Sequence, residues 1–203
     1  MKNCLETNKN EVGIDEAGRG CLMGRVYTGA VILPNSFSSD EYLEIKDSKK
    51  LSKIKREKMR AYIEKNALAW AVDYAEAEEI DKYNILNATL RSMHRAIDKL
   101  NIKPEHILVD GNKFIIYTDT NDDIIPHTLV KGGDNKYRNI AAASILAKTH
   151  RDEWVRNIIK DNPGIDQYSW ITNMGYGTKK HMEGIYKHGI TKYHRNSFKP
   201  CQI

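Results

Sequence analysis

Four acidic residues stand where their side chains could hold divalent cations. Asp15 and Glu16 follow a short apolar segment, Asp110 follows the run HILV, and Asp134 follows the run HTLV. Acids at the strand ends of an α/β sheet can converge on one crevice, where carboxylates about 4 Å apart repel by about 4 kcal/mol at an effective dielectric of about 20. Bound cations remove this repulsion, and oxygen-only ligands favour Mg²⁺ or Mn²⁺ over zinc. The alternative for each acid alone is a strand-end or helix-cap residue that bonds backbone N–H groups.

Two glycine-containing segments could bring the backbone close to a ligand. Residues 15–20 read DEAGRG, so Gly18 and Gly20 flank Arg19 directly after two of the acids. Residues 175–177 read GYG and place Tyr176 between two glycines. Glycine permits close approaches and backbone angles that other residues disfavour. An ordinary tight turn is the alternative for both segments, and the position of the first beside two acids favours a functional role.

The elements that must position these residues follow from the hydrophobic pattern. Strands are predicted for residues 11–15, 25–33, 68–74, 106–109 and 127–130. Helices are predicted for residues 52–66 with Ser52 as N-cap, from Asn84 to residue 100, and for residues 139–159. Three consecutive strands, then strands alternating with helices, indicate an α/β domain with a mixed sheet and a small C-terminal helical appendage.

The net charge of +5 lies entirely at the C-terminal end of the chain. Residues 175–203 hold six basic residues and one acidic residue, so residues 1–174 are electrically balanced. Tyrosine and phenylalanine are interleaved with these bases, which suits a nucleic-acid backbone with stackable bases; a solvated basic tail is the alternative. We therefore divide the chain into a polar extension at 1–10, a domain at 11–174 that holds the acids, and a basic binding segment at 175–203. Removal of the residues after Lys187 is predicted to weaken nucleic-acid binding.

Several classes of protein do not fit this sequence. A membrane-spanning helix needs about 20 apolar residues, whereas the run Ile140–Ala147 is short and interrupted by Ser144. The polar N-terminus MKNCLETNKN does not resemble a signal peptide. Three widely spaced cysteines suggest neither a disulfide framework nor a zinc site. We expect a cytoplasmic protein without membrane contact, and a monomer.

Seven motifs then occur in a recognisable order. They are DEAGRG at 15–20, DSKKLS at 47–52, VDG at 109–111, KGGDNK at 131–136, AAASILAKTHRD at 141–152, GYGTKKH at 175–181 and HRNSFKP at 194–200. Together they resemble the type 2 ribonuclease H family, ribonuclease HII, over about residues 12–200. The resemblance implies a ribonuclease H-like fold, with a five-stranded mixed sheet flanked by helices and a catalytic domain at 11–174. It also implies an endonuclease that cuts the RNA strand of RNA–DNA hybrids and single ribonucleotides in duplex DNA, at RNA–DNA junctions.

The resemblance also assigns roles to individual residues. Two divalent ions, Mg²⁺ or Mn²⁺, would be held by the catalytic acids Asp15, Glu16, Asp110 and Asp134, with Asp152 as a competitor for the fourth place. Substrate would be bound by the backbone of Gly18, Arg19 and Gly20 at the ribose 2′-hydroxyl, by Tyr176 at the RNA–DNA junction, and by Lys49 and Ser144 at phosphates. Cleavage would leave a 3′-hydroxyl and a 5′-phosphate.

This sequence departs from the family pattern at four places, and two other functions remain open. Cys21 replaces a proline, Gly133 is an additional glycine, Met174 replaces a lysine and Asn196 replaces an arginine. These changes are expected to affect loop geometry and substrate affinity. A non-catalytic protein that binds hybrid or duplex nucleic acid is one alternative, and another two-metal enzyme such as a phosphatase is a more distant one.

Overall fold

A five-stranded mixed sheet forms the centre of the molecule. The structure, a computed structural model, describes residues 1–37, 39–162 and 164–202. The strand order is β3-β2-β1-β4-β7, in which β1–β2 and β2–β3 are antiparallel and β1–β4 and β4–β7 are parallel. The bounds are Glu11–Ala17 for β1, Val26–Ile32 for β2, Ala69–Ala75 for β3, His106–Asp110 for β4 and His127–Val130 for β7. The predicted α/β fold with a five-stranded mixed sheet is confirmed.

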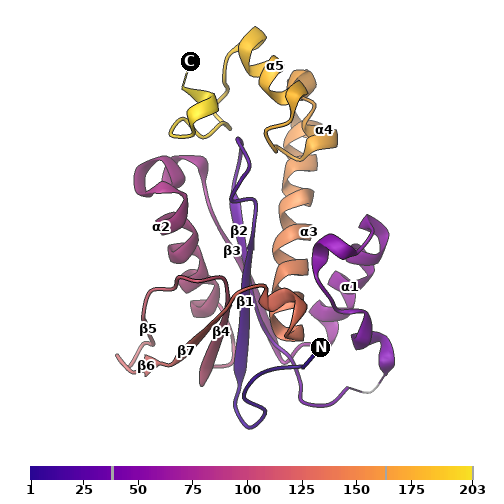
Figure 1. Ribbon diagram of the computed structural model, residues 1–203, viewed down its shortest axis with the longest axis vertical. Coiled ribbons are helices and arrows are strands. Elements are labelled where there is room, and N and C mark those ends of the chain that lie inside the picture. Colours follow the sequence, from indigo (N-terminus) through magenta and orange to yellow (C-terminus); the bar gives the residue numbers. More distant parts are fainter. Residues whose placement is uncertain (38, 163, 203) are drawn as a thin grey trace.

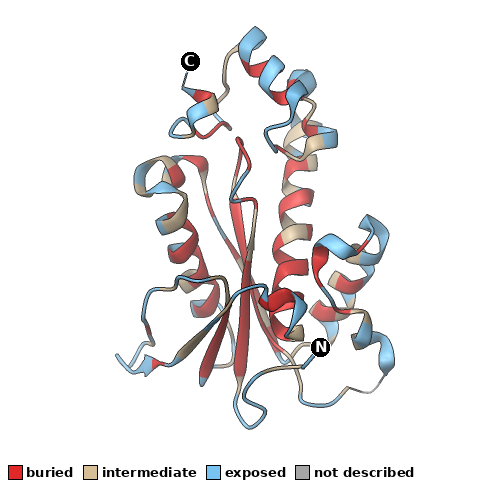
Figure 2. Cartoon of the chain, in the orientation of Figure 1, coloured by how far each residue is buried: buried red, intermediate tan, exposed pale blue. Residues whose placement is uncertain are grey.

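Helices cover both faces of this sheet (Figure 1). Their bounds are Lys53–Asn66 for α1, Ala77–Asp98 for α2 and Arg138–Asp161 for α3. Helix α2 lies on one face, and α3 lies on the other with α1 beside it. The α2 side of β1 buries Val12 and Ile14, and because side chains alternate along a strand, Gly13 and Asp15 face α3. Figure 2 shows that buried residues concentrate along the sheet and along the length of α3.

Two glycines allow α3 to lie close against the sheet. A Cβ atom on Gly13 would lie 2.2 Å from the carbonyl carbon of Asn139, and one on Gly29 would lie 2.4 Å from the carbonyl oxygen of Ala143. These separations are far inside van der Waals contact, so only glycine fits at either position. Asp15 is paired with Gly29 across β1 and β2. The first half of α3 is therefore held against the strand that carries Asp15.

Helix α2 begins earlier than predicted. We expected it to start at Asn84, whereas its first residue is Ala77. Asn84 interrupts the helix with φ 64° and ψ 162°, and its Oδ1 accepts a hydrogen bond from the N–H of Asn87 at 3.1 Å. Asn84 therefore caps the second part of a kinked helix. The first part was missed because only two of its seven residues, Ala77 and Ile80, are buried, too few to produce a helical period.

The C-terminal part of the chain packs onto the far end of α3 (Figure 1). Its elements are η4 (Ile165–Tyr168), α4 (Trp170–Asn173), α5 (Lys179–His188) and η5 (Lys199–Cys201). Tyr168, Trp170 and Ile185 form a buried cluster with Val155 of α3 and with Leu22. The predicted helical appendage is present. Side chains from both sides of the predicted boundary between residues 174 and 175 share its core.

The remaining elements are short. Three further 3-10 helices are η1 (Asp40–Glu44), η2 (Ser48–Lys50) and η3 (Gly133–Asn135). Strands β5 (Tyr117–Thr118) and β6 (Ile124–Ile125) form a separate antiparallel pair. Neither was predicted, because strands this short show no alternation of apolar and polar residues.

Candidate active site

The parallel strands bring the candidate acids to one edge of the sheet. β1 and β4 pair with Ile14 opposite Val109, so the residues that follow, Asp15 and Asp110, are neighbours where this pairing ends. β7 lies on the other side of β4, and Asp134 lies in η3, shortly after the end of β7. Since the carboxyl ends of parallel strands share one edge, all four predicted acids lie along it.

The additional glycine before Asp134 has a structural role. The backbone N–H of Gly133 donates a hydrogen bond to Oδ1 of Asp110 at 2.7 Å. A Cβ atom at this position would lie 2.4 Å from Cδ1 of Ile140 and 3.4 Å from the accepting oxygen. The departure at Gly133 therefore lets the loop after β7 approach Asp110 and orient its carboxylate.

The acids raise one another's pKa values. The pKa of Asp15 lies well above its ordinary value, first because the carboxyl group is buried and then because of the charges of Glu16 and Asp110. The pKa of Asp134 is raised by burial and then by the charges of Asp47 and Asp110. Burial also raises the pKa of Glu16. This mutual destabilisation of the charged forms indicates that the acids lie within electrostatic range of one another.

The acidic edge suits a divalent cation. Lys49 Nζ lies 4.0 Å from Asp134 Oδ2 with its side chain 85% exposed, and Arg19 Nη1 lies 3.2 Å from Glu16 Oε1. Across residues 1–37, 39–162 and 164–202, no three acid, histidine or cysteine side chains are already gathered as closely as ligands of one ion. The oxygen-only donors and their mutual repulsion, which the two exposed bases offset only in part, nevertheless fit Mg²⁺ or Mn²⁺ as stronger counter-charges.

The DSKK segment is fixed against the same edge. Ser48 Oγ and Ser144 Oγ lie 3.0 Å apart, and the nearby buried Ser144 hydroxyl acts to lower the pKa of Asp15. Asp47 accepts a hydrogen bond from the backbone N–H of Lys49 at 2.9 Å. Lys49 is thereby presented to solvent beside the acids, whereas Ser144 supports Asp15 from the interior.

Two buried arginines lie behind the Gly-Arg-Gly loop. Arg151 packs against Gly18, where a Cβ atom would lie 2.2 Å from its Nε, and donates to the carbonyl oxygen of Met174 at 2.8 Å. Arg195 donates to the carbonyl oxygens of Arg19 and Gly24 at 3.0 and 2.9 Å. Both side chains are fully buried. Arg195 therefore adds to the net charge of residues 175–203 without being one of its exposed basic groups. Burial of an arginine is not expected from residue type, because arginine is almost never fully buried unless it is paired.

Tyr176 lies beside this loop. It forms an antiparallel bridge with the buried Cys21, its side chain is 42% exposed, and Lys148 Nζ lies 5.6 Å from the centre of its ring. Asp152, the competitor for the fourth acid, instead accepts from Lys148 Nζ at 2.8 Å. The structure thus brings Tyr176 to the Gly-Arg-Gly loop and leaves Asp152 engaged on α3.

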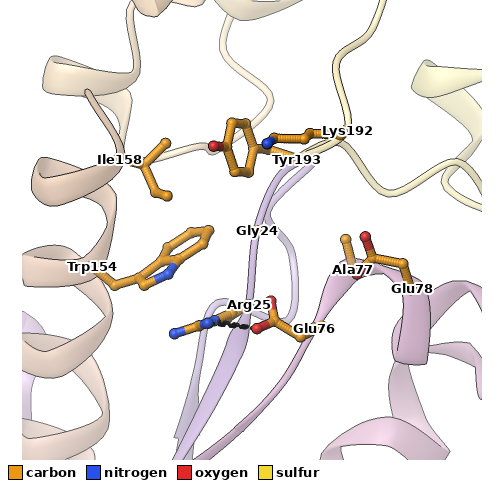
Figure 3. Close-up of a pocket in the computed structure, with 9 residues that line it drawn as sticks. All are labelled: Gly24, Arg25, Glu76, Ala77, Glu78, Trp154, Ile158, Lys192 and Tyr193. Atoms are coloured by element: carbon orange, nitrogen blue, oxygen red, sulfur yellow. Dashed lines mark hydrogen bonds and ion pairs between the residues drawn. The ribbon is translucent and has the colours of Figure 1, made fainter. Parts of the chain in front are cut away.

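A pocket of about 400 Å³ lies at Gly24 and Arg25, which follow the loop in sequence, and none of the four acids lines it (Figure 3). Within it the guanidinium of Arg25 lies 3.7 Å from the ring centre of Tyr74 and 5.0 Å from that of Trp154, and its Nη2 lies 2.5 Å from Glu76 Oε1. A Cβ atom on Gly24 would lie 2.3 Å from the Trp154 ring. This packing supports the loop, while the acids lie outside the pocket along the sheet edge.

Comparison with known proteins establishes the family. A protein-family model described as ribonuclease HII matches residues 12–201. The chain belongs to the ribonuclease HII family. The ribonuclease HII of Parabacteroides distasonis is 52% identical to it over 194 residues, which cover 96% of this chain and 92% of the relative.

Solved structures agree with the fold. The ribonuclease H2 of Pyrococcus horikoshii superposes with a TM-score of 0.77 at 22% identity, over 95% of each chain. Bst-RNase HIII in complex with Mn²⁺ gives a TM-score of 0.62 at 15% identity, over 95% of this chain and 68% of the other. These similarities confirm the predicted ribonuclease H-like architecture.

Family membership establishes the general activity. The chain is a metal-dependent endonuclease of the ribonuclease H type that acts on RNA-containing nucleic acid. This conclusion sets aside the non-catalytic binding protein and the phosphatase. Within the part of the chain that the structure describes, no helix is long and apolar enough to cross a membrane. The cytoplasmic location and the monomeric state stay predictions.

Proposed function

We propose that this enzyme cuts the RNA strand of RNA–DNA hybrids and also cuts duplex DNA at single embedded ribonucleotides. Its products would be a 3′-hydroxyl and a 5′-phosphate. The observation that carries the proposal is the position of four carboxylates along one sheet edge, where three of them have raised pKa values. A nucleic-acid binding protein does not need such a cluster, which would repel phosphates without bound cations.

Asp15, Glu16, Asp110 and Asp134 would hold two divalent ions, Mg²⁺ or Mn²⁺. Bound there, the ions would supply a water of lowered pKa as nucleophile and positive charge for the leaving 3′-oxygen. The chain itself orients the ligands: the N–H of Gly133 fixes Asp110, and the buried Ser144 hydroxyl supports Asp15. The Mn²⁺ complex of Bst-RNase HIII, which shares this fold, supports the use of divalent ions.

Recognition of the ribonucleotide would fall to the backbone of Gly18, Arg19 and Gly20 and to the ring of Tyr176. The loop backbone would bond the 2′-hydroxyl, the group that distinguishes RNA from DNA. The exposed part of the Tyr176 ring would pack against the sugar at the RNA–DNA junction. Lys49, which is exposed beside Asp134, would contact a phosphate. The direct phosphate contact assigned to Ser144 stays a prediction. The Ser144 side chain is buried and would have to become accessible to reach a phosphate.

The decisive experiment is cleavage of a labelled DNA duplex that contains one ribonucleotide. We expect one cut in the ribonucleotide strand with Mg²⁺ or Mn²⁺ and none with EDTA. Asp110→Asn should lower the rate by a factor of about 100 or more, a loss typical of removing an essential charged group, while duplex binding stays within about threefold. The exposed acid Asp122 provides a matched control as Asp122→Asn.

Three outcomes would contradict the proposal. Full activity of Asp110→Asn would remove the metal assignment. Cleavage that survives EDTA would remove the dependence on divalent ions. Cleavage of continuous hybrids without any cut at a single ribonucleotide would limit the activity to the broader class.

A further inference from the structure

Two buried histidines connect the C-terminal segment to Tyr176. The side chains of His181 and His194 are 0% and 1% exposed. Their Nε2 atoms lie 3.1 Å apart, and the ring of Tyr168 packs edge-on against both. Neither histidine lies among the candidate acids, so the proposed chemistry leaves both unexplained.

The hydrogen-bond partners fix where each ring carries its proton. His181 Nδ1 lies 3.0 Å from the carbonyl oxygen of Tyr176, which can only accept, so Nδ1 is protonated. The single lone pair of His181 Nε2 is then shared by two donors, Trp170 Nε1 at 3.0 Å and Nε2 of His194 at 3.1 Å. The remaining nitrogen, His194 Nδ1, accepts from the backbone N–H of Thr191 at 2.9 Å.

The result is a directed chain of hydrogen bonds, from Thr191 through His194 and His181 to Tyr176, in which both rings are neutral. An additional proton would place two donors face to face, at a cost comparable to an unsatisfied buried group. Burial agrees with this assignment, because it lowers the pKa of His181 and lowers that of His194 to about 4.

The buried pair and Arg195, which follows His194, together contact both parts of the proposed recognition surface. His181 bonds the carbonyl oxygen of Tyr176. Arg195, the neighbour of His194 in sequence, bonds the carbonyl oxygen of Arg19 in the Gly-Arg-Gly loop. The loop and the residue before Tyr176 also meet directly, where the N–H of Leu22 donates to Gly175 at 2.9 Å. Movement at His194 would therefore change the spacing between loop and tyrosine.

We propose that His181 and His194 are positioning residues that fix Tyr176 relative to the Gly-Arg-Gly loop and so determine the preference for a single ribonucleotide over a continuous hybrid. The inference rests on the proposed function. A continuous hybrid offers a 2′-hydroxyl at every position and tolerates a displaced tyrosine. A single ribonucleotide presents one junction, where the loop and the ring must act on adjacent sugars together.

The first test compares two substitutions at one position. His181→Leu removes the donor to Tyr176, whereas His181→Asn retains an amide N–H close to the place of Nδ1. We expect His181→Leu to lower kcat/KM on the single-ribonucleotide duplex by a factor of about 10 or more, in line with loss of one buried hydrogen bond. Activity on a continuous hybrid should fall by less than about threefold, and His181→Asn should recover most of the loss. His188→Leu, on the exposed side of the same helix, is the matched control.

The second test asks whether the effect passes through the tyrosine. In a Tyr176→Ala background, His181→Leu should cause no further loss on the single-ribonucleotide duplex, because coupled residues are not additive. Tyr186→Ala removes a tyrosine that is 89% exposed on α5 and serves as the control. Equal losses on both substrates, or additive losses in the double variant, would reduce the histidines to a structural role and overturn the proposal.

A third measurement uses the wild-type protein, so it does not depend on whether a variant folds. Nitrogen chemical shifts of the imidazoles should show His181 protonated at Nδ1 and His194 protonated at Nε2, both neutral at pH 6. Reversed tautomers, or a charged ring at pH 6, would overturn the relay even where cleavage is normal. Wild-type cleavage of hybrids without cleavage at single ribonucleotides would instead overturn the proposed function.

Discussion

Asp15 is the residue at which folding and the proposed chemistry conflict most directly. Its carboxyl group is buried beside Glu16 and Asp110, and its pKa is raised well above the ordinary value. The folded, metal-free protein therefore holds a proton there to a higher pH than the unfolded chain does. By linkage, the free energy of unfolding falls as the pH rises from the unfolded pKa, about 3.9, through the raised value. Above the raised pKa the penalty is fully present.

Asp15→Asn should consequently stabilise the metal-free protein at neutral pH while abolishing cleavage. We expect a rise in Tm of about 2–4 °C, corresponding to about 1 kcal/mol for a chain of this size. Addition of Mg²⁺ should raise the Tm of the wild type and leave the variant nearly unchanged. Thermal unfolding in EDTA and in Mg²⁺ measures both effects, with Asp122→Asn as control. A lower Tm for the variant in EDTA would show that Asp15 is not under electrostatic strain.

At the scale of elements, the contact between β1–β2 and α3 determines where Asp15 and Ser144 meet. Gly29→Ala would place a methyl group 2.4 Å from the Ala143 carbonyl oxygen, on backbone that cannot rotate away. We expect a loss of about 1–3 kcal/mol in the free energy of unfolding, typical of overpacking. We also expect the cleavage rate to fall by a larger factor than the affinity for the metal ion. Denaturant unfolding measures the first effect.

Gly20→Ala provides the comparison for stability alone. A Cβ atom there meets nothing within 4 Å, and Gly20 does not have a positive φ. Its free energy of unfolding should stay within about 0.5 kcal/mol of the wild type. If Gly29→Ala were equally harmless, the close packing of α3 would not be required for the position of Asp15.

Residue patterns within a short segment predicted most helices and strands. Contacts between residues far apart in the chain could not be predicted from the sequence. Ser52 caps α1 as predicted, with its Oγ accepting from the N–H of Lys55, because a cap depends only on neighbouring residues. The kink at Asn84 was read as a helix start for the same reason. The burial of Arg151 and Arg195 could not be read in this way, since it depends on carbonyl groups far away in the chain.

At the scale of the molecule, the C-terminal basic surplus is borne by a folded unit. Five lysines there are exposed: Lys179, Lys180, Lys187, Lys192 and Lys199. Arg195 is buried, and Cys201 belongs to the C-terminal core. Removal of the residues after Lys187, which sequence alone suggested as a test, would therefore damage the fold as well as the charge. Neutralising exposed lysines separates these effects.

Lys179→Gln combined with Lys180→Gln should weaken duplex binding and reduce its salt dependence. Each lost phosphate contact lowers the slope of log K against log salt by about 0.9, so two contacts would remove nearly two units. Binding titrations over a range of salt concentrations measure the slope. Lys9→Gln with Lys65→Gln, both exposed and far from the acidic edge, is the charge-matched control. An unchanged slope in the Lys179 and Lys180 variant would show that these lysines are solvated and do not contact phosphate.

Helix α3 connects the two ends of the proposed substrate path. Ser144 lies beside Asp15 at one point of the helix, and Arg151 packs against Gly18 of the loop seven residues later. Seven residues correspond to about 10 Å of helix. The helix is thus a rod of fixed length along which the acidic edge and the Gly-Arg-Gly loop are both aligned. Insertion or deletion of one residue between Ser144 and Arg151 would rotate one of the two contacts by about 100° around the helix axis, so both contacts are kept only at this spacing.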